Sequence, residues 1–397
     1  MRLLGLAAAA AVLAACQNSG NAPTSSLPTP SADRAQPGAV LIDPGAGSDR
    51  VPVDTKVRVS APRGGELTSV HVSSLGPGRV SGTLSQDRER WTATTPLAPG
   101  ARYTVSVRST DAAGKTLTKT ATFTTEPAER TFVGEYHPDK GTTVGVGMPI
   151  SIVFNHTVAD RAAIERNLSV SSSPAVEGAW SWMKDRDGND RIDYRPHRYW
   201  RPNTQVTLRM HLAGVDAGDG VYGTQERTVH FRVGQSVVTT VDAADKTMTV
   251  VKNGTTLRTL RVSAGKEGFE TWNGTMLVLS KVPTIRMDSS TVGIFGQEAY
   301  DLGEVKWDVQ LTPSGTYVHA APWNAGKFGL VNSSHGCIGL STEDARWFYE
   351  QVNPGDPVTV IHSADTVAVN NGYGDWNVDW STWTSGSALT EPFPSSA

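Results

Sequence analysis

Apolar and polar residues alternate in short runs between residues 39 and 126. Strict alternation places every second side chain on the same face, which is the pattern of a half-buried β-strand. Turns rich in Pro and Gly separate the runs, and no stretch has the spacing of an amphipathic helix. The alternating runs are residues 56–60, 69–72, 88–94 and 102–107. Several short strands at this spacing predict a β-sandwich.

Residues 127–235 repeat this plan. The strand-like runs are residues 149–154, 168–170, 180–182 and 205–210. Residues 228–233 match residues 120–125 in their position at the end of the pattern. The repetition predicts two tandem immunoglobulin-like domains, at 39–126 and 127–235, in preference to one large domain.

A third domain is predicted over residues 236–362. It opens with β-hairpin patterns at residues 237–241, 247–251 and 257–262. One helix follows Ser341, a capping residue with an acid, Asp344, three positions later. Residues 363–397 form a tail that contains tryptophans. The expected fold class is therefore mainly β, with two sandwich domains followed by a β-rich domain that has one or two helices.

The first residues have the composition of an export signal. Arg2 precedes an apolar run, residues 3–15, that is too short to cross a bilayer. Small residues before Cys16 resemble the lipobox of bacterial lipoproteins, which implies removal of residues 1–15 and lipidation of the Cys16 thiol. The expected location is then the outer face of the cytoplasmic membrane, facing the periplasm or cell wall. An ordinary secretory signal is the alternative. Residues 16–38 hold almost no large apolar side chain and predict a flexible linker.

The charge balance argues against a nucleic-acid partner. The 397 residues carry 36 basic and 39 acidic side chains, a net charge of -3, with no block of like charges.

Two turns are rich in oxygen ligands. Residues 185–193 begin like a calcium loop, but Pro196 stands where such a loop needs a bidentate Glu, so a hairpin turn is predicted. Asp216, Asp219 and Gly220 could hold Ca²⁺ through carboxylates and carbonyls, and a plain polar turn is the alternative.

Cys337 is the only cysteine besides Cys16, and two histidines accompany it. A thiol is mostly protonated at neutral pH, so a nucleophilic cysteine needs a histidine to take its proton. His319 comes from a separate strand-like segment and can be positioned independently, which favours it over His335 as the base. The amides of Gly336 and Cys337 could bind a developing oxyanion. An open zinc site and a buried, inert thiol remain alternatives.

The spacing from His319 to the run 334–337 (Ser-His-Gly-Cys) resembles the L,D-transpeptidase catalytic domain, the YkuD family. The flanking segments that resemble the mycobacterial and actinobacterial branch are residues 287–291, 319–323 and 347–349. This resemblance implies 3→3 cross-linking of peptidoglycan stem peptides. Cys337 would attack the third residue of a tetrapeptide donor, and a diaminopimelate amine of the acceptor would resolve the thioester.

The resemblance also implies roles for further residues. Met287, Tyr300, Ser314 and Gly315 correspond to substrate contacts, and His335 to a residue that shapes the pocket. Carbapenems are expected to acylate the thiol, and no cofactor is required.

Two departures from the family pattern stand out. Gly339 occupies the substrate-contact position two residues after the cysteine, where the family usually has Asn, so a side-chain amide is missing. The spacing from Tyr300 to Trp307 is one residue longer than in the family. A hydrolase using the same acyl-enzyme and a non-catalytic wall-binding lipoprotein remain alternatives.

Overall fold

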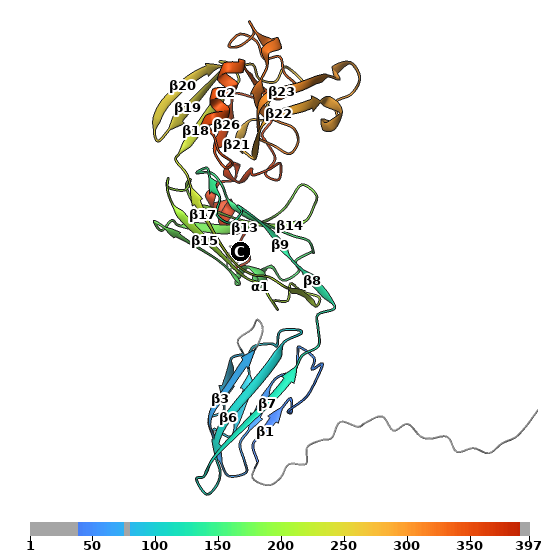
Figure 1. Cartoon of the computed structure of the whole chain (residues 1–397), viewed down its shortest axis with the longest axis vertical. Helices are drawn as coiled ribbons and strands as arrows, with labels where there is room; N and C mark the ends of the chain where they lie inside the picture. Colours follow the sequence, from blue (N-terminus) through green and yellow to red (C-terminus); the bar gives the residue numbers. More distant parts are fainter. Residues whose placement is uncertain (1–38, 75–79, 390–397) are drawn as a thin grey trace, which may run out of the picture.

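The computed structural model describes residues 39–74 and 80–389; the predicted signal peptide, Cys16 and the whole linker lie outside this range. Three packed units follow one another along an elongated molecule (Figure 1), and each has its own buried apolar cluster. The strands far outnumber the short helices, which confirms the predicted fold class. Within the described ranges, no helix is long and apolar enough to span a membrane.

The first unit is a sandwich of two sheets. One sheet has the order β1-β2-β5-β4 and the other β3-β6-β7. Their strands are β1 (Leu41–Asp43), β2 (Arg58–Ser60), β3 (Glu66–Ser74), β4 (Gly82–Leu84), β5 (Arg90–Ala93), β6 (Arg102–Thr110) and β7 (Thr116–Thr124). Alternate residues of β6 are buried, as the sequence pattern predicts, and the rings of Tyr103 and Phe123 stack at 5.2 Å in the core.

The second unit is also a sandwich, with sheets β13-β14-β11-β9 and β10-β17-β15-β12 and a small pair, β16-β8. Its elements are β8 (Arg130–Phe132), β9 (Gly134–His137), β10 (Thr143–Val144), β11 (Ile150–Phe154), α1 (Arg161–Glu165), β12 (Leu168–Ser173), β13 (Gly178–Lys184), β14 (Asp190–Pro196), β15 (Gln205–His211), β16 (Val221–Gly223) and β17 (Glu226–Val233). The carboxylate of Asp185 accepts the amides of Asp187 and Asn189 between β13 and β14. This confirms the predicted hairpin turn.

The third unit has two sheets, β20-β19-β18-β26-β21 and β22-β23-β24-β25. Its strands are β18 (Val237–Asp242), β19 (Thr247–Lys252), β20 (Thr255–Arg261), β21 (Gly274–Leu277), β22 (Ser280–Asp288), β23 (Asp301–Gln310), β24 (Tyr317–Ala320), β25 (Ile338–Leu340) and β26 (Pro357–Ile361). Its helices are α2 (Thr342–Gln351) and the 3₁₀ turns η1 (Ser289–Val292), η2 (Gly296–Glu298) and η3 (Pro322–Asn324). The Ser341 hydroxyl accepts the amide of Asp344 at 3.1 Å, which confirms the predicted helix start.

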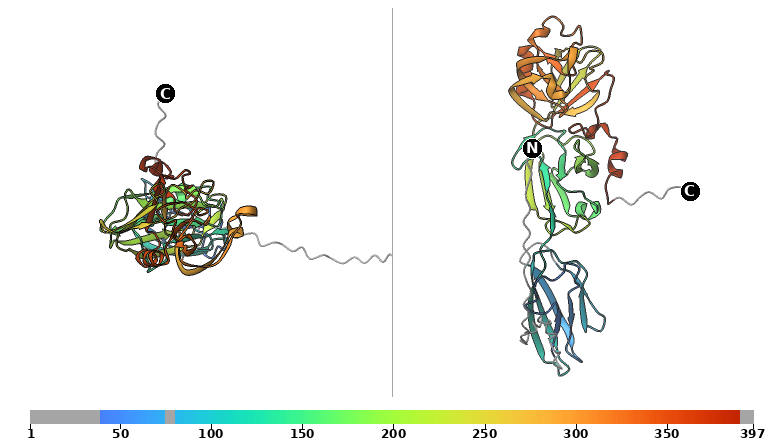
Figure 2. Two further views of the ribbon diagram at one scale, coloured as in Figure 1. Left: turned by 90° about the horizontal axis from the view of Figure 1, so that it is seen from above. Right: turned by 90° about the vertical axis from the view of Figure 1, so that its right-hand side faces the viewer.

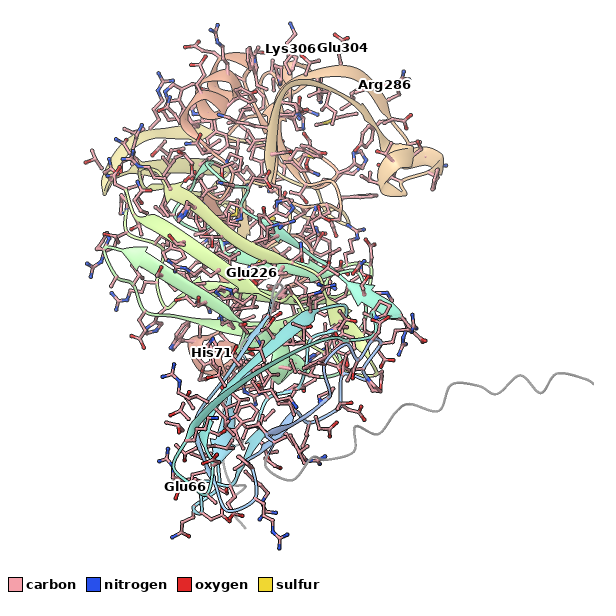
Figure 3. All side chains as sticks on the ribbon, turned by 60° about the horizontal axis from the view of Figure 1, so that its bottom comes forward. Glu66, His71, Glu226, Arg286, Glu304 and Lys306 are labelled. Carbon is pink, nitrogen blue, oxygen red and sulfur yellow. The ribbon has the colours of Figure 1, made fainter. Side chains whose placement is uncertain are left out.

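The long hairpin β22–β23 projects from the third unit (Figure 1). Arg286, Glu304 and Lys306 lie along its outer side (Figure 3), where they are exposed. The two short 3₁₀ turns η1 and η2 form the tip of this hairpin, and we call residues 286–304 the hairpin tip segment.

The tail returns from the third unit along the second (Figure 2). It contains η4 (Asp375–Asn377) and α3 (Trp380–Ser385), and α3 packs on β13. The guanidinium of Arg195 lies over the rings of Trp376, Trp380 and Trp383 at 4.7, 5.2 and 4.6 Å. These cation–π contacts attach the tail to the second unit.

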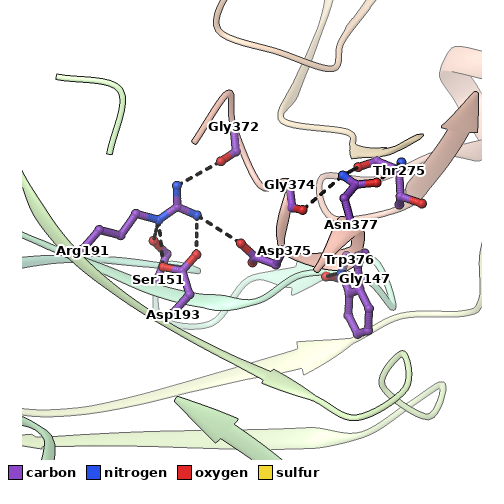
Figure 4. A network of polar contacts seen from close by, with 10 residues as sticks. All are labelled: Gly147, Ser151, Arg191, Asp193, Thr275, Gly372, Gly374, Asp375, Trp376 and Asn377. Carbon is purple, nitrogen blue, oxygen red and sulfur yellow. Dashed lines mark hydrogen bonds and ion pairs between the residues drawn. The ribbon is translucent and has the colours of Figure 1, made fainter. Parts of the chain in front are cut away.

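A buried polar network joins the same two parts (Figure 4). Arg191 donates to the carbonyl of Gly372 at 2.9 Å and to the hydroxyl of Ser151 at 3.0 Å, and it pairs with Asp193. Asp375 lies 3.8 Å from the same guanidinium. Burial and the neighbouring Asp193 raise the pKa of Asp375, because one guanidinium does not balance two buried carboxylates.

Candidate active site

The predicted nucleophile and base lie on neighbouring strands of the sheet β22-β23-β24-β25. His319 belongs to β24, and Cys337 directly precedes β25. The two strands run parallel, with Val318 opposite Ile338 and His319 opposite Gly339. Side chains alternate between the faces of a sheet, so His319 and Cys337 project from one face. Val318 and Ile338 project from the other face and join the core that α2 covers.

The hydrogen bonding of His319 fixes its tautomer. The ring is buried, and its Nδ1 lies 2.9 Å from the carbonyl oxygen of Ala320. A carbonyl can only accept, so Nδ1 carries the hydrogen and Nε2 keeps a free lone pair. Burial lowers the pKa of His319, which keeps the ring neutral near pH 7. The indole of Trp323 stacks on the ring at 5.9 Å. His319 is therefore prepared to accept a proton at Nε2.

The Cys337 thiol is buried and protonated in the resting protein. Its Sγ lies 3.5 Å from the carbonyl oxygen of Gly315, to which it donates. Burial, with a smaller contribution from the nearby Asp308 carboxyl, raises its pKa to about 11. A thiol with such a pKa needs a base at the moment of attack. The neutral imidazole of His319 lies on the same face of the sheet and can act as this base.

In the loop before Cys337, the Gly336 amide already has an acceptor. Gly336 has a left-handed φ of 113°, and its amide donates to the hydroxyl of Ser334 at 3.1 Å. That hydroxyl in turn donates to the Cys337 carbonyl at 2.6 Å. The use of the Gly336 amide for an oxyanion stays a prediction, and it requires this amide to exchange the Ser334 hydroxyl for the oxyanion. The amide of Cys337 itself is left for that role.

His335 is turned toward the hairpin tip segment and not toward the thiol. Its Nε2 lies 2.7 Å from a carboxylate oxygen of Glu298, and Lys266 pairs with the same carboxylate. Hydrogen bonds from Lys266 and then His335 lower the pKa of Glu298. The ring of Tyr300 lies 5.0 Å from that of His335. His335 and Tyr300 thus form one wall beside the thiol, and Met287 is half-buried in β22.

The hairpin β22–β23 has an irregularity close to Tyr300. The register between β22 and β23 shifts between Arg286 and Asp288, where one more residue lies on the β23 side. Tyr300 lies just before this irregularity and contacts His335, and its longer spacing to Trp307 relative to the family stays a prediction.

Ser314 and Gly315 form the turn opposite the thiol. The Ser314 hydroxyl accepts from the Asn371 amide at 2.8 Å, so the tail supports this turn. Gly315 has a left-handed φ of 103°, and a Cβ there would lie 2.4 Å from Val292. Glycine at 315 therefore lets η1 approach the turn that holds the Cys337 thiol.

Among the described residues, no group of three or more His, Cys, Asp or Glu side chains is arranged to hold a metal ion. The Asp216 carboxylate accepts the amide of Gly218, and Arg130 donates to the carbonyl of Asp219. Calcium at this turn, including Gly220, stays a prediction.

The sequence does not single out three polar residues of the site: Asp308, whose charge acts on the Cys337 thiol, Glu298, which pairs with His335, and Asn324, which lies beside Gly339. Glu298 lies in a loop-like stretch without periodicity, and no local signal marks it. Asp308 offered a weak signal, because an acid interrupts the apolar positions of a strand. Asn324 follows Trp323 in the segment after the base and had no feature of its own.

Comparison with known proteins agrees with this arrangement. Residues 48–216 match the family described as a bacterial Ig domain, and residues 236–360 match the L,D-transpeptidase catalytic domain. L,D-transpeptidase 2 of Mycobacterium tuberculosis (strain CDC 1551 / Oshkosh) is 36% identical over 90% of this chain and 88% of its own length. L,D-transpeptidase 5 of M. tuberculosis (strain ATCC 25618 / H37Rv) is 34% identical over 79% of this chain and 69% of its own. A structure of the L,D-transpeptidase LdtMt1 in complex with imipenem superposes with a TM-score of 0.50, at 35% identity, over 58% of this chain and 99% of that one.

Proposed function

Because the chain belongs to the L,D-transpeptidase family, we propose that it forms 3→3 cross-links between peptidoglycan stem peptides through a thioester on Cys337. The observation that carries this assignment is the pairing of a buried thiol with a neutral imidazole on one sheet face. The tautomer of His319 leaves Nε2 free to receive the thiol proton.

The reaction then proceeds in two stages. Cys337 Sγ attacks the carbonyl carbon of the third stem residue while His319 Nε2 takes the thiol proton. The tetrahedral intermediate collapses to a thioester, and the imidazolium gives its proton to the departing D-alanine amine. The side-chain amine of a neighbouring diaminopimelate attacks the thioester, His319 accepts its proton, and the thiol is released. Every step uses only the two side chains, so the proposed reaction needs no cofactor.

The enzyme acts outside the cytoplasm, where its substrate is. We further propose that Cys16 is lipidated and that residues 16–38 tether the enzyme to the outer face of the cytoplasmic membrane. Labelling with a radioactive fatty acid, compared between wild type and Cys16→Ala, tests this anchor separately from catalysis.

Imipenem provides the direct test of the nucleophile, because a relative was solved in complex with it. We expect imipenem to add one covalent adduct to the wild-type protein and none to Cys337→Ala, measured by intact mass spectrometry. Purified disaccharide tetrapeptides should give cross-linked dimers. Trimmed monomers without dimers would instead identify a hydrolase, and a protein that forms no adduct at all would be a non-catalytic wall-binding lipoprotein.

A further inference from the structure

Position 339 lacks a side chain at a crowded point of the reactive face. Gly339 pairs with His319 on one side and exchanges two backbone hydrogen bonds with Ser263 on the other, at 3.0 and 2.8 Å. A Cβ built on Gly339 would lie 3.0 Å from the Cβ of Ala321 and 3.7 Å from Nδ2 of Asn324. The space in which a side chain at 339 would stand is therefore occupied by the segment that follows the base.

Asn324 presents an unused hydrogen-bond donor in that space. The residue is buried, with 5% of its surface exposed, and its Oδ1 accepts from the hydroxyl of Ser333 at 3.2 Å. This contact orients the amide so that Nδ2 points toward Gly339. Nδ2 has no hydrogen-bond partner among the described residues. This nitrogen is not among the fully enclosed polar atoms that lack a partner, so it keeps contact with solvent, and an oxygen of a bound ligand can replace water as its acceptor.

The location of this amide indicates which part of a substrate it meets. Gly339 lies directly beside His319, and Trp323, the residue before Asn324, stacks on the His319 ring. In the proposed reaction His319 gives a proton to the departing amine, so the leaving D-alanine must lie beside this ring. The oxygen atoms of that residue that face away from the scissile bond are those of its carboxylate.

We propose that Asn324 is a substrate-binding residue whose side-chain amide donates to the terminal carboxylate of the leaving D-alanine. It supplies, from another segment of the chain, a side-chain amide next to Gly339, which has no side chain of its own. The inference rests on the proposed transpeptidase function and adds the residue that recognises the end of the donor stem.

The test compares two synthetic tetrapeptide donors, one ending in D-alanine and one ending in D-alanine amide. Thioester formation on Cys337 is followed by quenched-flow mass spectrometry on the full protein. Wild type should prefer the free carboxylate, and Asn324→Ala should reduce this preference about tenfold, the usual effect of losing one hydrogen bond to a charged group. Asn324→Asp, which has nearly the same shape, should reduce it at least as much because two carboxylates repel each other.

Two further variants separate recognition from folding. Ser333→Ala removes the hydrogen bond that orients the amide of Asn324 but leaves the Nδ2 donor, so it should lose part of the preference and clearly less than Asn324→Ala loses. Gly339→Asn added to Asn324→Ala returns an amide to the same space and should restore the preference, and a double variant that does not regain it counts against the proposal.

The proposal is overturned if Asn324→Ala keeps the wild-type preference, or if Ser333→Ala loses as much of it. These results differ from a failure of the function itself, in which neither donor nor imipenem would modify Cys337 of the wild type.

Discussion

Replacing Asp308 by Asn should remove a pH-dependent loss of stability from the third unit. Asp308 lies on β23 and is fully buried, and neither carboxylate oxygen has a hydrogen bond of normal geometry with a described residue. Burial raises its pKa from 3.8 to about 7. In the unfolded chain the carboxyl loses its proton near pH 4, whereas in the native state it keeps the proton to about pH 7. The native state therefore binds more protons between these pH values, and the free energy of unfolding falls as pH rises through this window.

The magnitude follows from the shift. A change from 3.8 to about 7 is about three pH units, and each unit corresponds to about 1.4 kcal/mol, which gives about 4 kcal/mol. Asn has almost the same shape as Asp but does not ionise. The stability of wild type minus that of Asp308→Asn should therefore fall by about 4 kcal/mol from pH 4 to 7 and be level above that. Other buried acids such as Asp356 are present in both proteins and cancel in this difference.

Hydrogen exchange of peptides from β23 and β24 is the appropriate assay, because a chain with several packed units does not unfold in a single transition. Exposed Glu304 lies on the same strand, so Glu304→Gln serves as the matched control. The difference in stability between wild type and Glu304→Gln should not change over the same pH range. A level difference for Asp308→Asn as well would refute the reasoning, since it would mean that the native carboxyl ionises as it does in the unfolded chain.

Two further predictions concern the hairpin tip segment. Among the described residues, the pairs of Glu298 with Lys266 and His335 are its only polar links to the rest of the third unit. Glu298→Gln should therefore speed the alkylation of Cys337 by iodoacetamide about fivefold. High salt screens the ion pairs and should bring the alkylation rate of wild type toward that of the variant. Equal alkylation rates for both proteins at low salt would contradict the role of the Glu298 pairs. Gly315→Ala should lower the stability of the third unit by about 1–3 kcal/mol, because it combines a left-handed φ of 103° with a Cβ 2.4 Å from Val292. An unchanged melting temperature would show that the turn adapts.

Most of the fold could be predicted because its signals are local. Alternation marks strands such as β6 and β15, and a capping serine marks the start of α2. Local sequence patterns do not predict how the tail packs on the second unit. The cation–π contacts of Arg195 join residues almost two hundred positions apart, and no pattern within either segment specifies its partner.

The site was predicted in part. Cys337 and His319 could be selected as chemical candidates, since a thiol and an imidazole are rare and their reactivity depends on residue type. The expected use of the Gly336 amide stays a prediction, and the side chain of Ser334 competes for that amide in the folded loop. Local hydrogen bonds of this kind depend on backbone angles that residue types do not determine.

By itself, the sequence determined the strand-rich architecture and the candidates for nucleophile and base, because periodicity and reactive residue types are properties of neighbouring positions. Only the tertiary structure decided how these groups are used. The bond from His319 to the Ala320 carbonyl, the burial of Asp308 and the approach of Asn324 to Gly339 all follow from strand register and loop packing. Register and packing are set by contacts between distant segments, and a shift of one residue in β23 or β24 would turn Asp308 or His319 to the opposite face.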